Sequence, residues 1–271
     1  MKVWMLGSGS QGNALLLESG GTRVLIDAGF PARTLGQRLA AIGIPAASVE
    51  AVLVTHEHGD HACGAAVAAR RWGWTVLASA GTLRACPELV AAGARSFAPG
   101  DVIRVGRLAL QTVPVPHDAE APVAVVATAD SSGARVGICY DLGRGTDAIR
   151  RAFTDLDLLV LEANHDPRML RMGPYPPVVQ QRIAGPHGHL SNAAAAVIAR
   201  DCAHSHLRHV ILAHLSEHCN EPALALRTVS SVLADARFRG TLTAATQRGV
   251  AGPFEPNARR RGPPAQLSLG F

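Results

Sequence analysis

Three histidines and an aspartate lie within six positions of the chain, as His56, His58, Asp60 and His61. They follow the apolar run 51–54 directly. Neutral imidazole and carboxylate groups suit borderline and hard divalent metal ions. A strand that ends in this loop can direct His56 and His58 at one ion, and Asp60 and His61 at a second. Because two ions about 3.5–4 Å apart can stabilise the attacking and leaving oxygens together, the pattern indicates hydrolysis at a dinuclear site.

Two ions need more ligands than one loop supplies, and three further candidates follow predicted strands. They are His117 after residues 108–113, Asp141 after residues 135–140, and His214 after residues 209–213. A single histidine or aspartate at a strand end is usually an ordinary turn residue. The joint occurrence of all three behind an HxHxDH segment favours ligation over the alternative, which is a polar surface loop rich in histidine.

The elements that must position these residues alternate between short strands and helices. The predicted strands are residues 3–6, 14–18, 23–27, 51–54, 75–78, 102–105, 108–113, 123–129, 135–140, 156–161, 209–213 and 241–246. The predicted helices are residues 31–42, 62–72, 145–153, 191–202 and 221–234, with Ser191 as an N-cap. Strand clusters flanked by helices in both halves predict two sheets packed face to face with helices outside.

The composition limits the domain count and the cellular setting. We expect one catalytic domain, residues 1–252, and a disordered tail rich in proline, glycine and arginine, residues 253–271. Lysine and arginine number 26 against 21 acidic residues, a formal charge of +5 that permits a polyanionic substrate without requiring one. With no apolar run of about 18 residues and no signal-like start, we expect a cytoplasmic protein without a membrane span. Five scattered cysteines argue against a disulfide framework.

These candidate ligands resemble those of the metallo-β-lactamase superfamily. The resemblance implies a fold of the mixed α/β (α+β) class, a four-layer αββα sandwich with two divalent metal ions. It implies that His56, His58 and His117 hold the first ion, that Asp60, His61 and His214 hold the second, and that Asp141 bridges them. Asp60 would also orient the nucleophilic water. The donor types allow zinc or manganese.

A narrower resemblance covers several separated blocks of the chain. Residues 7–13 match a GSxSxGN opening, and residues 161–166, 169–170, 173–176 and 188–192 follow in order. These blocks resemble the YycJ-type (WalJ) nucleases, which are single-domain relatives of RNase Z and RNase J, over residues 1–254. The resemblance implies a metal-dependent phosphodiesterase, a 5′-to-3′ DNA exonuclease of replication or mismatch repair.

The same resemblance suggests a general acid. RNase Z enzymes carry a glutamate and a histidine in comparable motifs, and the histidine protonates the leaving oxygen. By position, His189 would be the acid and Glu162 its partner. Histidine suits this role because it titrates near neutral pH. The alternatives are that His189 merely begins a helix, or that His165 or His187 is the acid; His218 lies close to His214 in sequence.

The last six residues, 266–271, read QLSLGF. A polar linker that ends in exposed apolar residues suits docking into a hydrophobic groove. The segment resembles the peptide with which bacterial proteins bind the DNA sliding clamp. Gln266, Leu267, Leu269 and Phe271 would make the contacts. A frayed end with a chance match is the alternative.

Three other functions remain open from the sequence. The first is RNA processing, because the RNase relatives cut RNA. The second is a glyoxalase-II-like thioester hydrolase, which uses a similar ligand set. The third is a clamp-bound scaffold without turnover. The Gly188–Asn192 block and the clamp-like tail favour the DNA exonuclease over the thioesterase.

Overall fold

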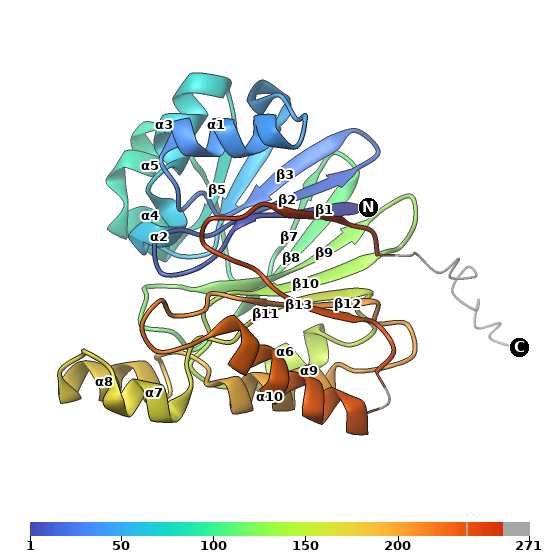
Figure 1. Cartoon of the computed structure of the whole chain (residues 1–271). Helices are drawn as coiled ribbons and strands as arrows, with labels where there is room; N and C mark the ends of the chain where they lie inside the picture. Colours follow the sequence, from blue (N-terminus) through green and yellow to red (C-terminus); the bar gives the residue numbers. More distant parts are fainter. Residues whose placement is uncertain (237, 257–271) are drawn as a thin grey trace, which may run out of the picture.

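Two seven-stranded sheets form the centre of the molecule in the computed structural model, and helices cover their outer faces (Figure 1). The structure describes residues 1–236 and 238–256. The first sheet has the order β14-β1-β2-β3-β4-β5-β6, and the second has the order β13-β12-β11-β10-β9-β8-β7. The four-layer αββα sandwich expected from the sequence is confirmed.

The first half of the chain builds most of the first sheet. Its strands are β1 (Lys2–Gly7), β2 (Ala14–Ser19), β3 (Thr22–Ile26), β4 (Ala51–Val54), β5 (Thr75–Ser79) and β6 (Arg95–Phe97). Its helices are α1 (Ala32–Ala41), α2 (Gly59–Ala62), α3 (Ala65–Trp72), α4 (Ala80–Ala85) and α5 (Pro87–Ala91), with a 3-10 turn at Ala46–Ser48. The strand β14 (Ala251–Phe254) completes this sheet from the other end of the chain.

The second half builds the second sheet. Its strands are β7 (Val102–Val105), β8 (Leu108–Pro114), β9 (Val123–Ala129), β10 (Arg135–Cys139), β11 (Leu158–Glu162), β12 (His209–Ala213) and β13 (Thr241–Ala244). Its helices are α6 (Asp147–Ala152), α7 (Pro167–Met172), α8 (Pro177–Ala184), α9 (Asn192–Asp201) and α10 (Pro222–Asp235). The hydroxyl of Ser191 accepts the Ala194 N–H (3.2 Å), so its predicted N-cap role is confirmed.

The main core lies between the two sheets. Leu15 and Leu53 of the first sheet pack in one cluster with Val125 and Ile138 of the second, and all four are fully buried. Alternate residues of the same strands point outward and pack under the helices in two further clusters. The central strands are buried on both faces, which explains why they read as continuous apolar runs rather than as alternating patterns.

The predicted helix 62–72 is wrong in its extent, because the structure divides it into α2 and α3 around Gly64. The Gly64 N–H donates to the Ala28 carbonyl (2.8 Å). A Cβ atom at Gly64 would lie 2.0 Å from the Phe30 carbonyl oxygen. The backbone must therefore turn against the loop after β3, and this turn carries Asp60 and His61 on a short helix of their own.

The sequence-based predictions did not include α4, α5, β6, the helical hairpin α7–α8 or the strand β14. The helical hairpin α7–α8 lies between β11 and α9, and Figure 1 shows it projecting from the body of the molecule. The strand β14 pairs Phe254 with Val3 and Ala251 with Met5, so sheet pairing continues beyond residue 252. Residues 257–271, including the predicted clamp-binding positions Gln266, Leu267, Leu269 and Phe271, lie outside the described residues. None of the helices within residues 1–236 and 238–256 has the length and apolar character needed to cross a membrane.

Candidate metal centre

All seven predicted metal ligands meet at one edge of the sandwich, in the loops that follow the strands. Those of the HxHxDH segment follow β4, and the others follow β8, β10 and β12 in the second sheet. Their donor atoms form three groups, and the atoms of each group lie within 4.8 Å of one another. The groups are His56, His58 and His117; Asp60, His61 and His214; and His56, His61 and Asp141. The described residues therefore bring together the complete set that the sequence suggested.

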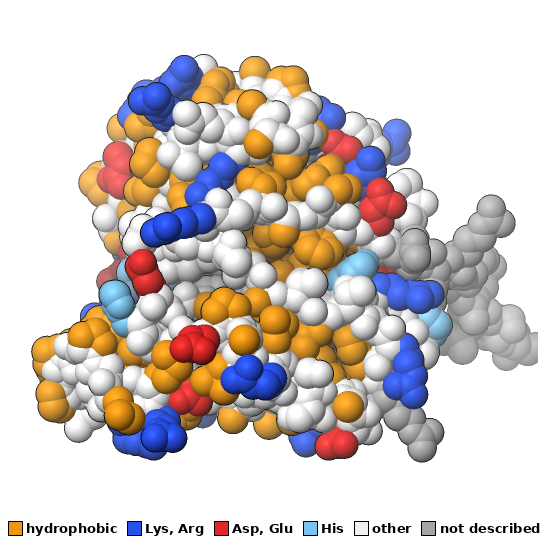
Figure 2. All heavy atoms as spheres, in the orientation of Figure 1, with side chains coloured by type: hydrophobic (Ala, Val, Ile, Leu, Met, Phe, Trp, Pro, Cys, Tyr) orange, Lys and Arg blue, Asp and Glu red, His pale blue; other side chains and the backbone are white. Residues whose placement is uncertain are grey.

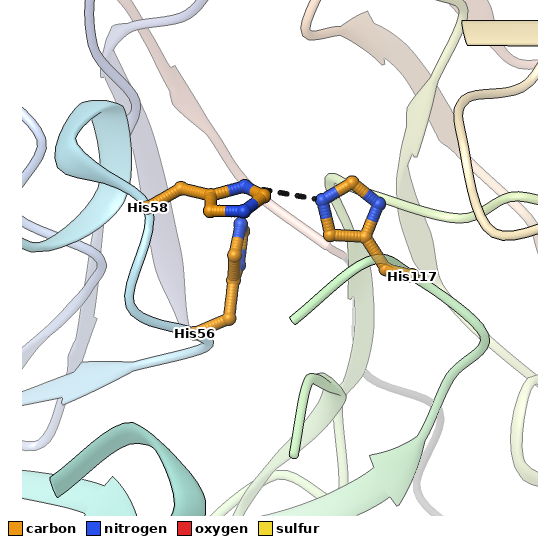
Figure 3. Close-up of side chains that lie close together, drawn as sticks. All are labelled: His56, His58 and His117. Carbon is orange, nitrogen blue, oxygen red and sulfur yellow. Dashed lines mark hydrogen bonds between the residues drawn. The ribbon is translucent and has the colours of Figure 1, made fainter. Parts of the chain in front are cut away.

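The first group consists of three imidazoles that point toward one another (Figure 3). His56 and His58 extend from the loop after β4, and His117 faces them from the second sheet. The Nε2 atom of His117 lies 3.2 Å from Nδ1 of His58. The Nε2 atom of His56 is buried and has no hydrogen-bond partner among residues 1–236 and 238–256. A buried nitrogen without a partner is costly unless a ligand binds it, so this group fits a metal ion.

The second group combines two imidazoles with a carboxylate. Oδ2 of Asp60 lies 3.1 Å from Nε2 of His214 and 3.3 Å from Nε2 of His61. Burial raises the pKa of Asp60, but its bonds to His214 and His61 outweigh burial and hold the pKa well below its usual range. A carboxylate beside two imidazoles is a donor set that suits a divalent ion.

Asp141 lies between the two groups. One carboxylate oxygen, Oδ2, is 2.9 Å from Nε2 of His61 and 3.9 Å from Nε2 of His56. The other, Oδ1, is 3.8 Å from Nε2 of His117. Burial opposes its ionisation, but His214 and His61 outweigh burial and hold the pKa of Asp141 well below its usual range. A buried carboxylate that faces both groups is suited to a bridging position.

Sequence reasoning assigned no role to Asp27, whose carboxylate contacts His61 and, through Thr55, His56. Its carboxylate accepts the Thr55 N–H (2.7 Å) and the Thr55 hydroxyl (2.9 Å), and it lies 2.7 Å from Nδ1 of His61. The Thr55 hydroxyl is also 3.0 Å from Nδ1 of His56. Donation from Nδ1 leaves the Nε2 lone pair of each ring free for a metal. Asp27 thus orients one histidine of each group.

We expect Asp27→Asn to weaken metal binding by roughly 10- to 100-fold, because the single amide oxygen cannot replace both carboxylate oxygens, which accept from the Thr55 N–H on one side and face the Thr55 hydroxyl and His61 on the other. Titration of the metal-free protein with zinc or manganese against a competing chelator measures the affinity. Asp130→Asn, which removes a carboxylate from an exposed hairpin, is the matched control. Equal affinities for both variants would contradict the role assigned to Asp27.

Backbone strain coincides with the site. Among the described residues, three non-glycine positions have positive φ, and two of them are Asp27 (63°) and His214 (51°). The loop that follows β1 holds the backbone at His214 and Asp60: the His214 N–H donates to the Ser8 hydroxyl (2.8 Å), and the Asn13 N–H donates to the Asp60 carbonyl (2.8 Å). A Cβ at Gly29 would lie 1.6 Å from that carbonyl oxygen, so only glycine permits this approach. The GSxSxGN opening therefore supports the metal loop.

The predicted acid pair lies beside the ligand groups. Nδ1 of His189 is 2.6 Å from Oε1 of Glu162 and 3.1 Å from Oδ1 of Asp141. Glu162 is fully buried, and its second oxygen accepts the N–H groups of Leu142 (2.9 Å) and Leu190 (3.0 Å). Burial lowers the pKa of His189, but the carboxylates of Glu162 and Asp141 outweigh burial and raise it well above its usual value.

A cavity of about 170 Å³ opens onto these groups. It is lined by Ser10, His58, Asp60, Asp141, Asn164, Tyr175, Arg182, Ile183, His189, His214 and Ser216. His189 is the one histidine in this lining that does not belong to the predicted ligand set. His165, His187 and His218 are absent from it, so the geometry favours His189 among the candidates for the acid.

The sandwich and the adjoining histidine–aspartate groups define a class, the αββα hydrolases that use divalent metal ions. The chain belongs to the metallo-β-lactamase superfamily, because the family model for that superfamily matches residues 7–154. The donor atoms present fit the metal ions that this superfamily generally uses.

Within the superfamily, the chain is similar to exodeoxyribonucleases. It is 32% identical over 238 residues to the exodeoxyribonuclease YycJ of Bacillus anthracis, covering 86% of this chain and 89% of the relative. It is 32% identical over 241 residues to the exodeoxyribonuclease WalJ of Streptococcus pneumoniae, covering 87% and 89%. The narrower resemblance seen in the sequence is therefore confirmed.

Solved structures agree on the fold. The protein YhfI of Bacillus subtilis superposes with a TM-score of 0.70 at 19% identity, covering 92% of this chain and 98% of that one. The short form of human tRNase Z superposes with a TM-score of 0.64 at 16% identity, covering 94% and 100%. At such low identity these matches support the architecture alone.

Proposed function

We propose that the chain is a dinuclear metal-dependent DNA exonuclease that degrades strands in the 5′-to-3′ direction during replication or mismatch repair. The observation that carries the proposal is the position of the His189–Glu162 pair beside two adjoining ligand groups in one cavity. The exodeoxyribonuclease names of two relatives support DNA as the substrate.

We assign the two metal positions from the donor groups. His56, His58 and His117 would hold the first ion, Asp60, His61 and His214 the second, and Asp141 both. Bound divalent ions supply positive charge that stabilises the charge developing on a phosphodiester and favours ionisation of water. The imidazoles favour zinc, whereas the carboxylates and the phosphate chemistry also suit manganese.

The protein's own groups would position and move protons. Asp60 accepts a hydrogen bond from the attacking water and orients it toward phosphorus. The water oxygen bonds to phosphorus and its proton is released to solvent as the bond to the leaving oxygen breaks. The leaving oxygen departs poorly as an alkoxide. His189 donates the proton that it needs. Glu162 fixes the ring by accepting from Nδ1, so that Nε2 is the proton donor.

Hydrolysis of double-stranded DNA, labelled at the 5′ or the 3′ end, tests the function. RNA and a thioester are assayed in parallel, with metal-reconstituted protein and with Asp60→Ala as the control. Mononucleotides released from the 5′ end by wild type alone would support the proposal. Cleavage of RNA or of the thioester without cleavage of DNA would retain the metal site and overturn the substrate.

We further propose that residues 1–252 form the catalytic domain and that the tail, residues 253–271, tethers it to the bacterial sliding clamp. The QLSLGF sequence of residues 266–271 supports this assignment, because a glutamine followed by spaced apolar residues suits a hydrophobic groove with one directional hydrogen bond.

Deletion of residues 266–271 is expected to abolish binding to the purified clamp while hydrolysis of free DNA stays within about twofold of wild type, since the catalytic groups lie elsewhere. Surface plasmon resonance measures binding to the clamp, and the nuclease assay measures hydrolysis of DNA. Ser268→Ala should bind normally, because Ser268 is not among the proposed contacts. Clamp binding by the deletion variant would contradict the tether.

A further inference from the structure

The hairpin α7–α8 lies beside the catalytic cavity and has no role in holding the metal. In the sequence, the hairpin follows β11, the strand that ends at Glu162, and it precedes His189. Figure 2 shows hydrophobic and basic side chains over this projecting end, at the lower left of the view. The segment Gly173–Pro176 joins the two helices. It belongs to the YycJ-like pattern, but the proposed mechanism assigns it no role.

This connection holds Tyr175 in a defined place. Tyr175 lies between Pro174 and Pro176, whose rings restrict the backbone on both sides. The side chain of Gln180 donates to the Tyr175 carbonyl (2.9 Å). The ring meets His218 edge-on, with centroids 6.1 Å apart and planes at 70°. The ring is thus fixed before any ligand binds, which lowers the entropic cost of stacking.

Tyr175 and Ile183 are the large apolar side chains in the lining of the catalytic cavity, and the other residues there are mostly polar. Phosphoryl chemistry gives no reason for an aromatic ring at this position. A nucleic acid gives one, because a base beside a phosphodiester has an apolar face that aromatic rings stack on. The chain has only two tyrosines, and this one faces the site where a strand would be cut.

Arg182 lies on the same wall. Its guanidinium pairs with Asp118, which follows the candidate ligand His117, and its side chain remains 67% exposed. Arginine is suited to phosphate because its planar donors match phosphate oxygens. The backbone of the same turn supports the proposed acid, since the Ile183 carbonyl accepts the His189 N–H (2.8 Å). The helix that carries Arg182 is therefore hydrogen-bonded to the backbone of the proposed acid.

We propose that the hairpin is the nucleotide-binding wall of the enzyme: Tyr175 stacks on a base next to the cleaved phosphodiester, and Arg182 binds a neighbouring phosphate. This inference rests on the proposed nuclease function and specifies how the strand is held. The wall recognises any base, because stacking uses the face that all bases share.

Substrates that lack one base test the stacking directly. Two DNA duplexes carry a tetrahydrofuran abasic nucleotide on the 5′ or on the 3′ side of the first phosphodiester to be cut. Wild type should show a KM roughly 5- to 100-fold higher on one of them than on intact DNA. Tyr175→Ala should raise KM on intact DNA by a similar factor and cleave intact and abasic DNA alike. Tyr175→Phe, which keeps the ring, should behave like wild type.

Salt dependence tests the phosphate contact. Arg182→Ala should raise KM on DNA and should lower the slope of log KM against log salt by about 1. Arg171→Ala, on the same hairpin but outside the lining of the catalytic cavity, is the matched control and should have the wild-type slope. Thermal unfolding of each variant checks that the hairpin is intact.

The outcomes separate the two proposals. The stacking role alone is overturned if wild type cleaves DNA but does not discriminate against either abasic substrate. The same conclusion follows if Tyr175→Ala has a wild-type KM. An unchanged salt slope in Arg182→Ala overturns the phosphate contact. Wild type that is inactive on DNA but hydrolyses another substrate in an Asp60-dependent manner overturns the nuclease function and the wall together.

Discussion

Asp60→Ala is expected to abolish nearly all turnover of the metal-reconstituted protein, with a fall in kcat/KM of roughly 10³-fold or more. The carboxylate faces both histidines of the second ligand group and is the group assigned to orient the water. Its removal leaves the fold in place, because the backbone carbonyl of Asp60 still accepts the Asn13 N–H. Steady-state hydrolysis of labelled DNA measures the loss.

His56→Ala should cause a comparable loss, because it removes the buried Nε2 atom of the first group, which accepts and donates no hydrogen bond among the described residues. Circular dichroism and thermal unfolding establish that each variant is folded. Asp130→Ala, at an exposed hairpin, controls for the loss of a carboxylate. A wild-type rate in either Asp60→Ala or His56→Ala would remove the dinuclear mechanism.

His189→Ala is expected to lower kcat by roughly 10²- to 10⁴-fold on DNA, which is the usual contribution of a positioned general acid. The loss should depend on the leaving group. A p-nitrophenyl phosphodiester releases a phenolate that departs without protonation, so the variant should lose much less activity on it. Parallel assays on the two substrates measure this difference.

Glu162 acts through His189 and is a positioning residue. Glu162→Gln should therefore show the same dependence on leaving group with a smaller loss, because the amide can still accept a hydrogen bond from Nδ1 of His189. His206→Ala, which removes a histidine that lies outside the cavity lining and contacts the ring of His204, is the control. Equal losses on DNA and on the p-nitrophenyl ester would show that His189 supports the site without donating a proton.

Much of the site could be predicted because the ligands are arranged by short-range rules. The HxHxDH segment is contiguous, and His117, Asp141 and His214 each follow a recognisable apolar strand. Strands of one sandwich bring their ends to a common edge, so strand-end residues converge even when they are far apart in sequence. Each half of the sandwich supplies part of every ligand group. The pattern of strands was sufficient to predict that the two halves would share the site.

The rest of the site depends on contacts between loops that no local pattern encodes. Asp27 also ends a strand, but its role arises from its contacts with Thr55 and His61, and its left-handed backbone is held by the surrounding loops. Asn13 reaches Asp60 only because Gly29 permits close approach of two backbones. The hairpin α7–α8 was missed because its prolines and glycine read as loop, although proline at the first turn of each helix is compatible with helix formation.

The register of β14 places the last described residues of the chain beside the start of β1. Phe254 pairs with Val3 near the start of β1, whereas the loop after Gly7, at the other end of β1, contacts Asp60. The described chain therefore ends on the side opposite the metal ligands, as Figure 1 shows from the separation of α2 and the N-terminus. The chain beyond residue 256 starts from that side, so the proposed tether would be attached to the enzyme away from the mouth of the cavity.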